Sequence, residues 1–429
     1  MTTKLQHDID QLISSRPGAE SIKAASSFAQ TAAIQIYPNI YMSQGTSNSY
    51  MLVGSKQRVI INTGMGFEAL THKRLFDQVC THPISHIIVT QGHVDHVGGV
   101  AQFKEPESLF IAQQLNPQCQ KDDERIATLR QSQSYVWFNH VIDEALEVAK
   151  DHPEVFVQDR PEADILFKDS YHIELDNDTE QPLKLECIAL EGGETLDSVA
   201  VYLPAHDLVF AGNAFGPLFP HFPNFNTIRG DKYRFVEDYL QALNTIQQLK
   251  PKVLITGHGL PIQGQDLIEA ALERLKQAVI FIHENTLQRM NAGQPIHQIM
   301  QELQLPTELK VGQGYGRVEW AIRTFWESYI GWFKLSSTTE LLATPASAIN
   351  SDLVDLLDQP ALVEKARGYL ASGEIEKALH LVSIFDDVVS EQADILAIKR
   401  QLLEALLLRE QNNFWFKGWI EEQIKGLKA

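Results

Sequence analysis

The alternation of hydrophobic and polar residues predicts a series of short strands near the start of the chain. Runs of β-branched and aromatic residues, broken by Gly, Asn and Ser, occupy residues 34–44, 47–54 and 57–64. Apolar residues then recur at helical spacing over 67–80, and the compact apolar run 85–90 predicts a further strand. Strands and helices therefore alternate in this region.

A second β-rich block covers residues 155–215 and is followed by a predicted helix over 231–249. The segment KVLITGHG then repeats the pattern of a strand that delivers a histidine, here His258, at its end. Two comparable blocks of alternating elements indicate two sheets packed face to face with helices outside. We therefore predict an α/β fold with an αββα sandwich.

The β signal ends near residue 265. Residues 266–290 predict one long amphipathic helix, and 361–385 and 389–410 predict further helices. One face of another helix is predicted by apolar residues at i, i+4, i+7 and i+11, namely Val318, Ile322, Phe325 and Tyr329. The last part of the chain is therefore expected to be helical throughout.

These patterns divide the chain into three predicted parts. Residues 1–30 are expected to form a helical leader without catalytic residues, residues 31–280 the α/β domain, and residues 281–429 an all-helical module. At 429 residues, the chain is long enough for two or three domains.

The charge of the chain excludes several classes of partner. Lys and Arg number 36 against 55 Asp and Glu, which gives a formal net charge of −19. Such an acidic protein is poorly suited to bind nucleic acid or an anionic membrane surface, and an anionic substrate would need local positive charge. We expect no membrane span, because no stretch of about 18 apolar residues occurs.

The cysteines and the N-terminal segment predict a cytoplasmic protein. Cys80, Cys119 and Cys187 are far apart and form no CxxC pair, which is typical of reduced thiols. The first residues lack the apolar segment of a secretory signal.

The strongest candidate site follows the predicted strand that ends at Thr90. The sequence Gln-Gly-His-Val-Asp-His-Val-Gly-Gly begins at Gln91 and places His93, Asp95 and His96 on a polar loop before a helix. His and Asp are good ligands for zinc, iron or manganese. Paired glycines let the chain turn tightly beneath a metal. The loop therefore predicts a metal site.

This loop resembles the H-x-H-x-D-H signature of metallo-β-lactamase-fold hydrolases, with Gln91 in place of the first histidine. In that family the first two histidines bind metal one, and the Asp and last His bind metal two. Downstream, GGETLDS and ITGHGLP resemble ligand segments of the alkylsulfatase-like branch, in which Glu194 and His258 match the ligands. Asn213 stands where the family has a carboxylate that bridges both metals.

Two further segments resemble the same branch. Residues 222–234 (FPNFNTIRGDKYR) resemble the segment whose Arg contacts the sulfate group, and Arg229 is the match. Residues 315–333 resemble the opening of the alkylsulfatase dimerisation domain, and the resemblance resumes at 361–385. The resemblance therefore implies a metallo-β-lactamase sandwich followed by a helical domain that pairs two copies as a homodimer.

Two of the ligands implied by the resemblance are amides. The carbonyl oxygen of Gln91 can ligate a hard or borderline metal but is a weaker donor than imidazole. Asn213 is neutral and offers one oxygen, so it cannot bridge two cations as a carboxylate does. We expect metal two to bind and metal one to bind more weakly, or to suit a harder ion.

The cofactor expected is therefore one or two divalent ions per chain, with zinc preferred and iron or manganese as alternatives. The predicted metal ligands, in chain order, are Gln91, His93, Asp95, His96, Glu194, Asn213 and His258.

Three hypotheses follow for the function. The first is a metal-dependent hydrolase of a small anionic or amphiphilic ester, most simply an alkyl sulfate, which is attacked by a metal-bound hydroxide; Asp95 and Arg229 are its predicted catalytic residues. The second is a redox use of the same cage with two irons. The third is a binding or scaffold protein with a decayed site, in which the helical tail carries the function.

Overall fold

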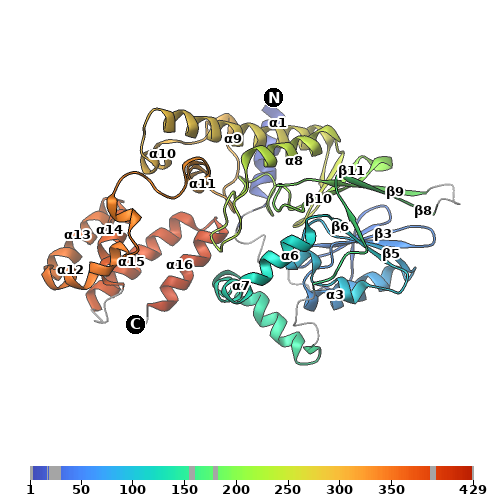
Figure 1. The fold of residues 1–429 in the computed structure, drawn as a ribbon, viewed down its shortest axis with the longest axis horizontal. Coiled ribbons are helices and arrows are strands. Elements are labelled where there is room, and N and C mark those ends of the chain that lie inside the picture. The colour runs from blue at the N-terminus through green and yellow to red at the C-terminus, as the bar shows by residue number, and fades with distance from the viewer. Residues whose placement is uncertain are drawn as a thin grey trace. The chain divides into compact units, whose positions relative to one another are not determined.

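The computed structural model describes residues 3–16, 18, 30–153, 160–176, 182–386 and 393–427. The chain forms two compact units, Met1–Phe325 and Trp326–Ala429 (Figure 1). The first unit carries both sheets and the candidate site, and the second is helical.

In the described part of the chain, the first sheet has seven strands in sequence order. They are β1 (Ile34–Tyr37), β2 (Ile40–Ser43), β3 (Ser49–Val53), β4 (Arg58–Ile61), β5 (Ile84–Ile88), β6 (Leu109–Gln113) and β7 (Ile165–Phe167). Strands β1 to β4 pair antiparallel. Strands β4 to β7 pair parallel, since helices connect them.

The second sheet, as far as the residues are described, has six strands in the order β13-β12-β11-β10-β9-β8. They are β8 (Ser170–Leu175), β9 (Leu183–Ala189), β10 (Val199–Leu203), β11 (Leu208–Gly212), β12 (Val253–Thr256) and β13 (Ile262–Gln263). Only β11 and β12 pair parallel in this sheet, and the ends of both strands therefore point to the same edge.

The two sheets pack face to face, and their side chains alternate between two cores. Tyr50 and Leu52 of β3 lie in the core between the sheets, whereas Met51 lies in the core on the outer, helix-covered face. Ile60 and Ile61 of β4 divide in the same way. This period-two pattern is what a strand buried on both faces requires.

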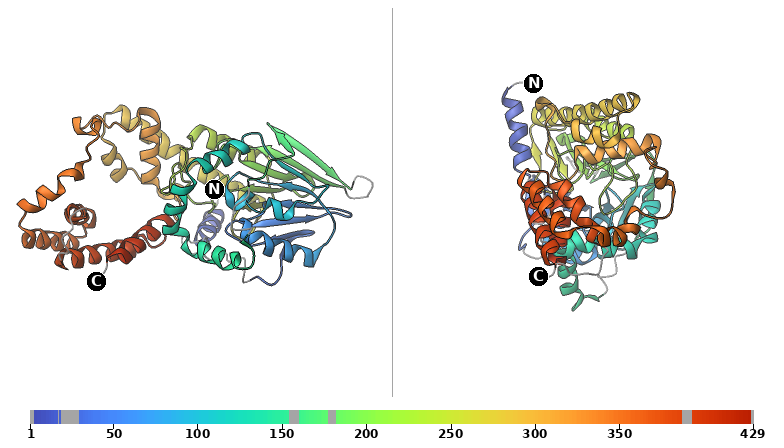
Figure 2. Two further views of the ribbon diagram at one scale, coloured as in Figure 1. Left: turned by 60° about the horizontal axis from the view of Figure 1, so that its bottom comes forward. Right: turned by 90° about the vertical axis from the view of Figure 1, so that its left-hand side faces the viewer.

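Helices cover the outer face of each sheet. The first sheet is covered by α3 (Gly66–Val79), α4 (Val94–Val97) and α5 (Val100–Phe103). The second sheet is covered by α8 (Val236–Gln248) and α9 (Gln265–Asn291), and α9 contacts β12 and β13. Figure 1 shows these layers in order from α9 to α3, and Figure 2 shows the same sheets from two other sides. The predicted αββα sandwich is confirmed.

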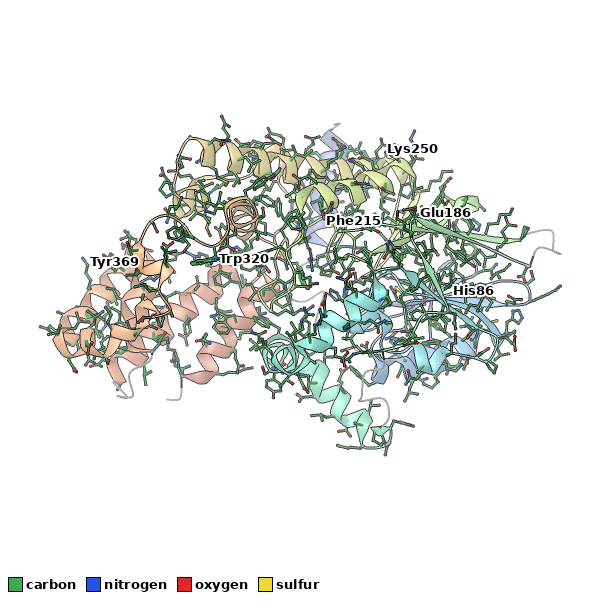
Figure 3. The ribbon with its side chains drawn as sticks, in the orientation of Figure 1. His86, Glu186, Phe215, Lys250, Trp320 and Tyr369 are labelled. Atoms are coloured by element: carbon green, nitrogen blue, oxygen red, sulfur yellow. The ribbon has the colours of Figure 1, made fainter. Side chains whose placement is uncertain are left out.

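Further elements connect these layers. Helices α6 (Asn116–Arg125) and α7 (Ala127–Ala149) follow β6, and α7 bends at Phe138, whose φ and ψ are −119° and 25°. Beyond β11, Phe215 is buried, and its ring centroid lies 5.3 Å from that of Phe219 (Figure 3). Helix α10 (Ile296–Glu302) follows α9.

The N-terminal helix α1 (Thr3–Ser14) belongs to the first unit, where it packs on α9. The guanidinium of Arg274, a buried residue of α9, donates to Asp10 at 2.6 Å. Of the predicted leader, residues 17, 19–29 and the first two residues lie outside the described part of the chain.

The predicted domain boundary after residue 280 falls within α9, whereas the compact units divide between Phe325 and Trp326, inside α11 (Val318–Ile330). The three predicted domain ranges remain a prediction.

The second unit is helical, as predicted for this part of the chain. Its helices are α12 (Asn350–Leu356), α13 (Gln359–Ala371), α14 (Ile375–Val382), α15 (Ala393–Glu410) and α16 (Phe414–Gly426). They share one apolar core that includes Ala366, Ala378 and Leu402. Gly373 has a φ of +79°, a conformation that glycine adopts without strain, and it turns the chain between α13 and α14. Among the described residues, no helix is long and apolar enough to cross a membrane.

Candidate active site

The predicted ligands come from loops at strand ends of both sheets. The loop between β5 and α4 carries Gln91 and His93. Asn213 follows β11 and His258 follows β12, and since these neighbouring strands are parallel, their ends deliver both side chains to one edge. Glu194 lies in the connection between β9 and β10. The fold thus gathers residues that are far apart in the sequence.

The glycine after the metal loop serves close packing. Gly99 has a φ of −98°, which any residue can adopt. A Cβ atom there would lie 2.4 Å from the Cβ of Ala69 and 2.5 Å from the carbonyl oxygen of Thr63. The Thr63 hydroxyl in turn donates to the carbonyl oxygen of His96 at 2.9 Å. Gly99 therefore lets α3 approach the segment that carries His96.

The first half of the site, here called the Gln91 half, consists of Gln91, His93 and Glu194. Gln91 is 1% exposed, and its Nε2 lies 2.9 Å from the Nδ1 of His93 and donates to Glu194 Oε2 at 2.9 Å. The Gln91 Oε1 is buried without a hydrogen-bond partner among the described residues. The amide nitrogen, and not the oxygen, therefore lies between the two predicted metal ligands.

Charged residues surround the Gln91 half. The His93 Nε2 lies 3.4 Å from Asp231 Oδ2, and Arg234 lies 3.6 Å from Glu194 Oε1 and 3.5 Å from Asp231 Oδ2. Burial lowers the pKa of His93, but the hydrogen bond and charge of Asp231, with Glu194 and Asp123, outweigh it and raise the pKa to about 9. The carboxylates thus favour a positive charge here.

The second half, here called the His258 half, consists of Asp95, His96 and His258. All three converge on the hydroxyl of Ser47, which donates to Asp95 Oδ2 and lies 3.2 Å from His96 Nε2 and 3.4 Å from His258 Nε2. Asp95 Oδ2 also lies 3.5 Å from His96 Nε2. Two imidazoles and a carboxylate therefore face one oxygen atom.

The protonation states in the His258 half follow from burial and from mutual charge. Burial lowers the pKa of His96, and it lowers the pKa of His258 to about 4, although Asp95 opposes both shifts. Burial raises the pKa of Asp95, but His96, His93 and the Ser47 hydrogen bond hold it well below its usual range. Neutral imidazoles and an ionised carboxylate are the forms that ligate a metal ion.

Asn213 lies beside the His258 half. Its Nδ2 lies 3.2 Å from His96 Nε2, and its Oδ1 is buried without a hydrogen-bond partner among the described residues. A Cβ atom at Gly257 would lie 2.2 Å from this oxygen, so the glycine provides the space for the amide. The predicted bridging position therefore holds an amide whose nitrogen contacts a ligand.

A buried arginine from the N-terminal segment holds the loop of His258. Arg16 donates to the carbonyl oxygens of Leu260 and, at 3.4 Å, Phe219, and to the hydroxyl of Thr256 at 3.3 Å. That hydroxyl donates to the carbonyl oxygen of His258 at 2.7 Å. A residue of the predicted leader therefore supports the loop of His258.

The loop of Ser47 has its own buried support. Glu68 of α3 accepts hydrogen bonds from the backbone N–H of Thr46 at 2.6 Å and of Met65 at 3.0 Å. Burial raises the pKa of Glu68 to about 7, in spite of these hydrogen bonds.

A cavity of about 180 Å³ opens onto both halves of the site. Polar groups from the site line one part of it: His93, Asp95, Glu194, Asn213, His258 and Arg229. Apolar side chains from α7 and neighbouring loops line the rest: Met65, Val94, Phe138, Val141, Ile142 and Pro217. Gln91 contacts His93, and His96 contacts Asn213, so both lie next to the residues that line the cavity. The structure therefore brings all eight predicted site residues together.

Arg229 is the cation of this cavity. Burial lowers the pKa of Arg229, but Tyr315, Asp231, Asp123 and Asp95 raise it, and the guanidinium stays charged. The side chain is partly exposed, as a group that meets a ligand must be.

Several contributing residues had no clear signal in the sequence. Ser47, Asp231 and Tyr315 lie far from the metal loop in the chain, and only the fold brings them to it. Asp231 follows Arg229 by two residues, so residues 222–234 contain both the predicted anion-binding arginine and the carboxylate that contacts His93.

The fit of a divalent ion differs between the two halves. Among the described residues, no group of three or more His, Cys, Asp or Glu side chains is close enough to hold an ion as it stands. In the His258 half, the donor atoms are those that zinc prefers, and their shared neighbour is an oxygen. In the Gln91 half, the shared neighbour is an amide N–H group. The donor types of the His258 half therefore suit a divalent ion, whereas an amide N–H group stands among those of the Gln91 half.

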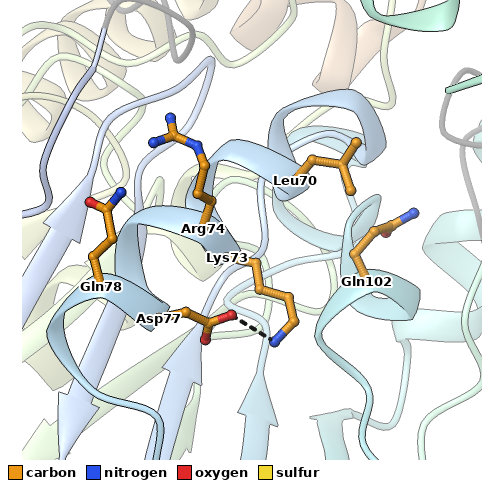
Figure 4. A pocket seen from close by; sticks show the side chains of 6 residues that line it. All are labelled: Leu70, Lys73, Arg74, Asp77, Gln78 and Gln102. Carbon is orange, nitrogen blue, oxygen red and sulfur yellow. Dashed lines mark ion pairs between the residues drawn. The ribbon is translucent and has the colours of Figure 1, made fainter. Parts of the chain in front are cut away.

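A second hollow on the surface lacks such chemistry. It lies along α3 and is lined by Leu70, Lys73, Arg74, Asp77, Gln78 and Gln102 (Figure 4). Lys73 and Asp77 form an ion pair at 3.3 Å across one turn of the helix, which is common on exposed helix faces.

Comparison with known families gives two matches. Residues 42–108, which include the metal loop, match the metallo-beta-lactamase superfamily. Residues 295–423 match the alkyl sulfatase dimerisation family.

Similar curated proteins are sulfatases. A linear primary-alkylsulfatase from a Pseudomonas species is 23% identical over 299 residues, which cover 66% of this chain and 56% of that protein. The alkyl/aryl-sulfatase BDS1 of Saccharomyces cerevisiae is 23% identical over 53% of this chain and 36% of its own length. The chain thus spans about half or less of the length of these relatives.

The fold is also similar to that of a solved structure. The stereoselective inverting sec-alkylsulfatase Pisa1 from a Pseudomonas species superimposes with a TM-score of 0.77 over 92% of this chain and 65% of its own, at 18% identity. At this identity the similarity concerns the fold alone.

Proposed function

We propose that this chain, an alkylsulfatase-like member of the metallo-β-lactamase superfamily, hydrolyses a small anionic ester, most simply an alkyl sulfate. One observation carries the proposal: Arg229 shares a single cavity with Asp95 and His258 and with an apolar wall. A sulfate ester has the matching parts, an anionic head and an apolar chain.

The guanidinium of Arg229 would bind the anionic group of the substrate. Guanidinium groups donate paired hydrogen bonds to the oxygens of such anions. In a chain with a net charge of −19, this local cation is what allows an anion to enter.

The apolar wall would take the alkyl part. Phe138, Val141 and Ile142 lie at and just after the bend of α7, and all three line the cavity. Burial of each CH₂ group contributes about 0.8 kcal/mol, so affinity should rise with chain length until the cavity is filled.

The His258 half would hold a divalent ion through Asp95, His96 and His258. Such an ion supplies electrophilic polarisation and an activated water when bound. The chain itself orients these ligands: Thr90 lies 3.3 Å from His96 Nδ1, and Arg16 and Thr256 hold the backbone at His258. Ordered supporting partners of this kind keep ligands in productive positions.

We further propose that the second unit pairs two copies as a homodimer. Its family match supports this, and so do large exposed apolar side chains in residues 332–357, among them Trp332, Leu335 and Leu356. A cytoplasmic location is proposed from the three cysteines, none of which forms a disulfide.

The test of hydrolysis is a panel of sulfate, phosphate and lactone esters, offered to protein loaded with zinc, manganese or iron. We expect release of inorganic sulfate from alkyl sulfates, with kcat/KM rising with alkyl chain length. Absence of turnover on the whole panel at full ion loading would contradict the proposal.

A binding protein without turnover is the second candidate, and the Gln91 half favours it, since an amide fills the place of a ligand there. It predicts that alkyl sulfates bind, as measured by calorimetry, without release of sulfate. The use of two irons for redox chemistry needs two ion positions, which the same amide opposes.

A further inference from the structure

We infer that the site takes one divalent ion, in the His258 half, and that the side-chain amide of Gln91 stands in place of a second. The inference deepens the proposed function, because it concerns the same site and states its ion content.

The position of the Gln91 amide carries the first step. Its Nε2 lies 2.9 Å from both His93 Nδ1 and Glu194 Oε2, so an ion held by those two atoms would need the same space. An amide nitrogen presents N–H groups and has no lone pair to offer a cation. As arranged, Gln91 therefore closes this position to an ion.

The charges of the Gln91 half already have protein partners. Glu194 accepts from Gln91 through one oxygen and lies 3.6 Å from Arg234 through the other. Asp231 lies beside His93 and beside the guanidinium of Arg130 at 3.3 Å. A buried carboxylate that is paired in this way needs no further cation.

The His258 half differs in both respects. The atom shared by Asp95, His96 and His258 is the hydroxyl oxygen of Ser47, which is neutral and keeps lone pairs. Among the described residues, Asp95 has no Lys or Arg within ion-pair distance, and His96 Nε2 lies 3.5 Å from its Oδ2. A carboxylate and two imidazoles around one neutral oxygen form a donor set that zinc accepts.

Asn213 agrees with a single ion. Its nitrogen contacts His96 Nε2, and its unpaired oxygen faces Gly257. If the amide turned over, it would offer one neutral oxygen to one ion, and it would still lack the second charged oxygen with which a carboxylate bridges two. Both amides thus limit the site to a single ion.

The experiment measures ion content without reference to activity. Full-length protein is stripped with chelator, reloaded with zinc alone, and analysed by elemental analysis and titration calorimetry. We expect about one zinc per chain for the natural protein and about two for the double variant Gln91→His/Asn213→Asp. The matched control makes the same two changes far from the site, Gln298→His/Asn285→Asp, and should stay at one.

Two zinc ions or none in the natural protein would overturn the inference, and so would a folded double variant that still binds one. If the double variant does not fold, Glu194→Gln decides the matter: one zinc with affinity within about threefold of the natural protein supports the inference, and loss of the ion overturns it. One bound zinc without hydrolysis of any ester would sink the proposed function and leave this inference intact.

Discussion

The two halves of the site contain similar residues, but a different chemical group lies at the centre of each. In the His258 half, two imidazoles and a carboxylate face one hydroxyl oxygen, and among the described residues no Lys or Arg lies within ion-pair distance of the carboxylate. In the Gln91 half, an imidazole and a carboxylate face an amide nitrogen, and Arg234 and Asp231 complete the charge balance.

The difference shows how one residue type decides whether a ligand cluster is open to an ion. A buried cluster must satisfy its hydrogen bonds and charges, either with an ion or with protein groups. The Gln91 half does so with protein groups, whereas the His258 half leaves a charge that an ion can balance.

The largest effect should come from removing a ligand of the His258 half. His258→Ala should lower zinc affinity by more than about a hundredfold, since loss of a supporting partner alone costs roughly 10–100-fold. The measurement is competition with a coloured chelator. Equal losses in His258→Ala and Glu194→Gln would erase the contrast between the halves.

The next effect concerns the substrate and not the ion. Arg229→Met should raise KM for an alkyl sulfate by about 10–150-fold, because a hydrogen bond to a charged group contributes about 1.5–3 kcal/mol. Zinc content should not change. Arg74→Met, at an exposed position on α3, is the matched control, and steady-state kinetics on the three proteins decide the matter. An unchanged KM would remove Arg229 from the substrate site.

A smaller effect tests the packing around Asn213. Gly257→Ala places a methyl group 2.2 Å from Asn213 Oδ1 and should lower the free energy of unfolding by about 1–3 kcal/mol in denaturant. The matched change Gly368→Ala in α13 meets nothing within 4 Å and should stabilise its helix by about 0.5–1 kcal/mol. A stable Gly257→Ala protein would mean that the amide is not fixed where it lies.

The last effect builds up gradually as pH falls and comes from a buried histidine packed against Ser43 and Gly45. His72 is fully buried, lies 2.7 Å from the Ser43 hydroxyl, and burial lowers its pKa to about 3. Below pH 6.5, His72 binds a proton in the unfolded chain but stays neutral in the folded chain. Stability should therefore be lost from pH 6.5 down towards pH 3, by up to about 1.4 kcal/mol per pH unit, and should be fully present above pH 6.5.

Denaturant unfolding between pH 7 and pH 5 measures this slope. His72→Gln should reduce the slope of unfolding free energy against pH by the contribution of about one proton. His297→Gln, at an exposed position, should leave the slope unchanged. The same slope in both variants would contradict the assignment to His72.

Much of this site could be read from the sequence because its ligands follow strands. The apolar run ending at Thr90 and the run in KVLITGHG each place histidines at a strand end. The parallel pairing of β11 and β12 then brings Asn213 and His258 to the same edge. Such local patterns can be recognised without knowledge of the tertiary structure.

The remainder depends on contacts between distant segments. Nothing in the sequence indicates that Ser47 reaches Asp95, that Asp231 reaches His93, or that Arg16 holds the loop of His258. The sequence also suggested Gln91 as an oxygen ligand, whereas its nitrogen faces Glu194; which end of an amide faces a carboxylate is decided by the charges around it.

The most direct measurement of the account is hydrolysis of an alkyl sulfate as zinc is added stepwise to ion-free protein. The account predicts that sulfate release rises in proportion to added zinc and levels off at one ion per chain. Activity that levels off only at two ions, or no activity at any loading, would contradict it.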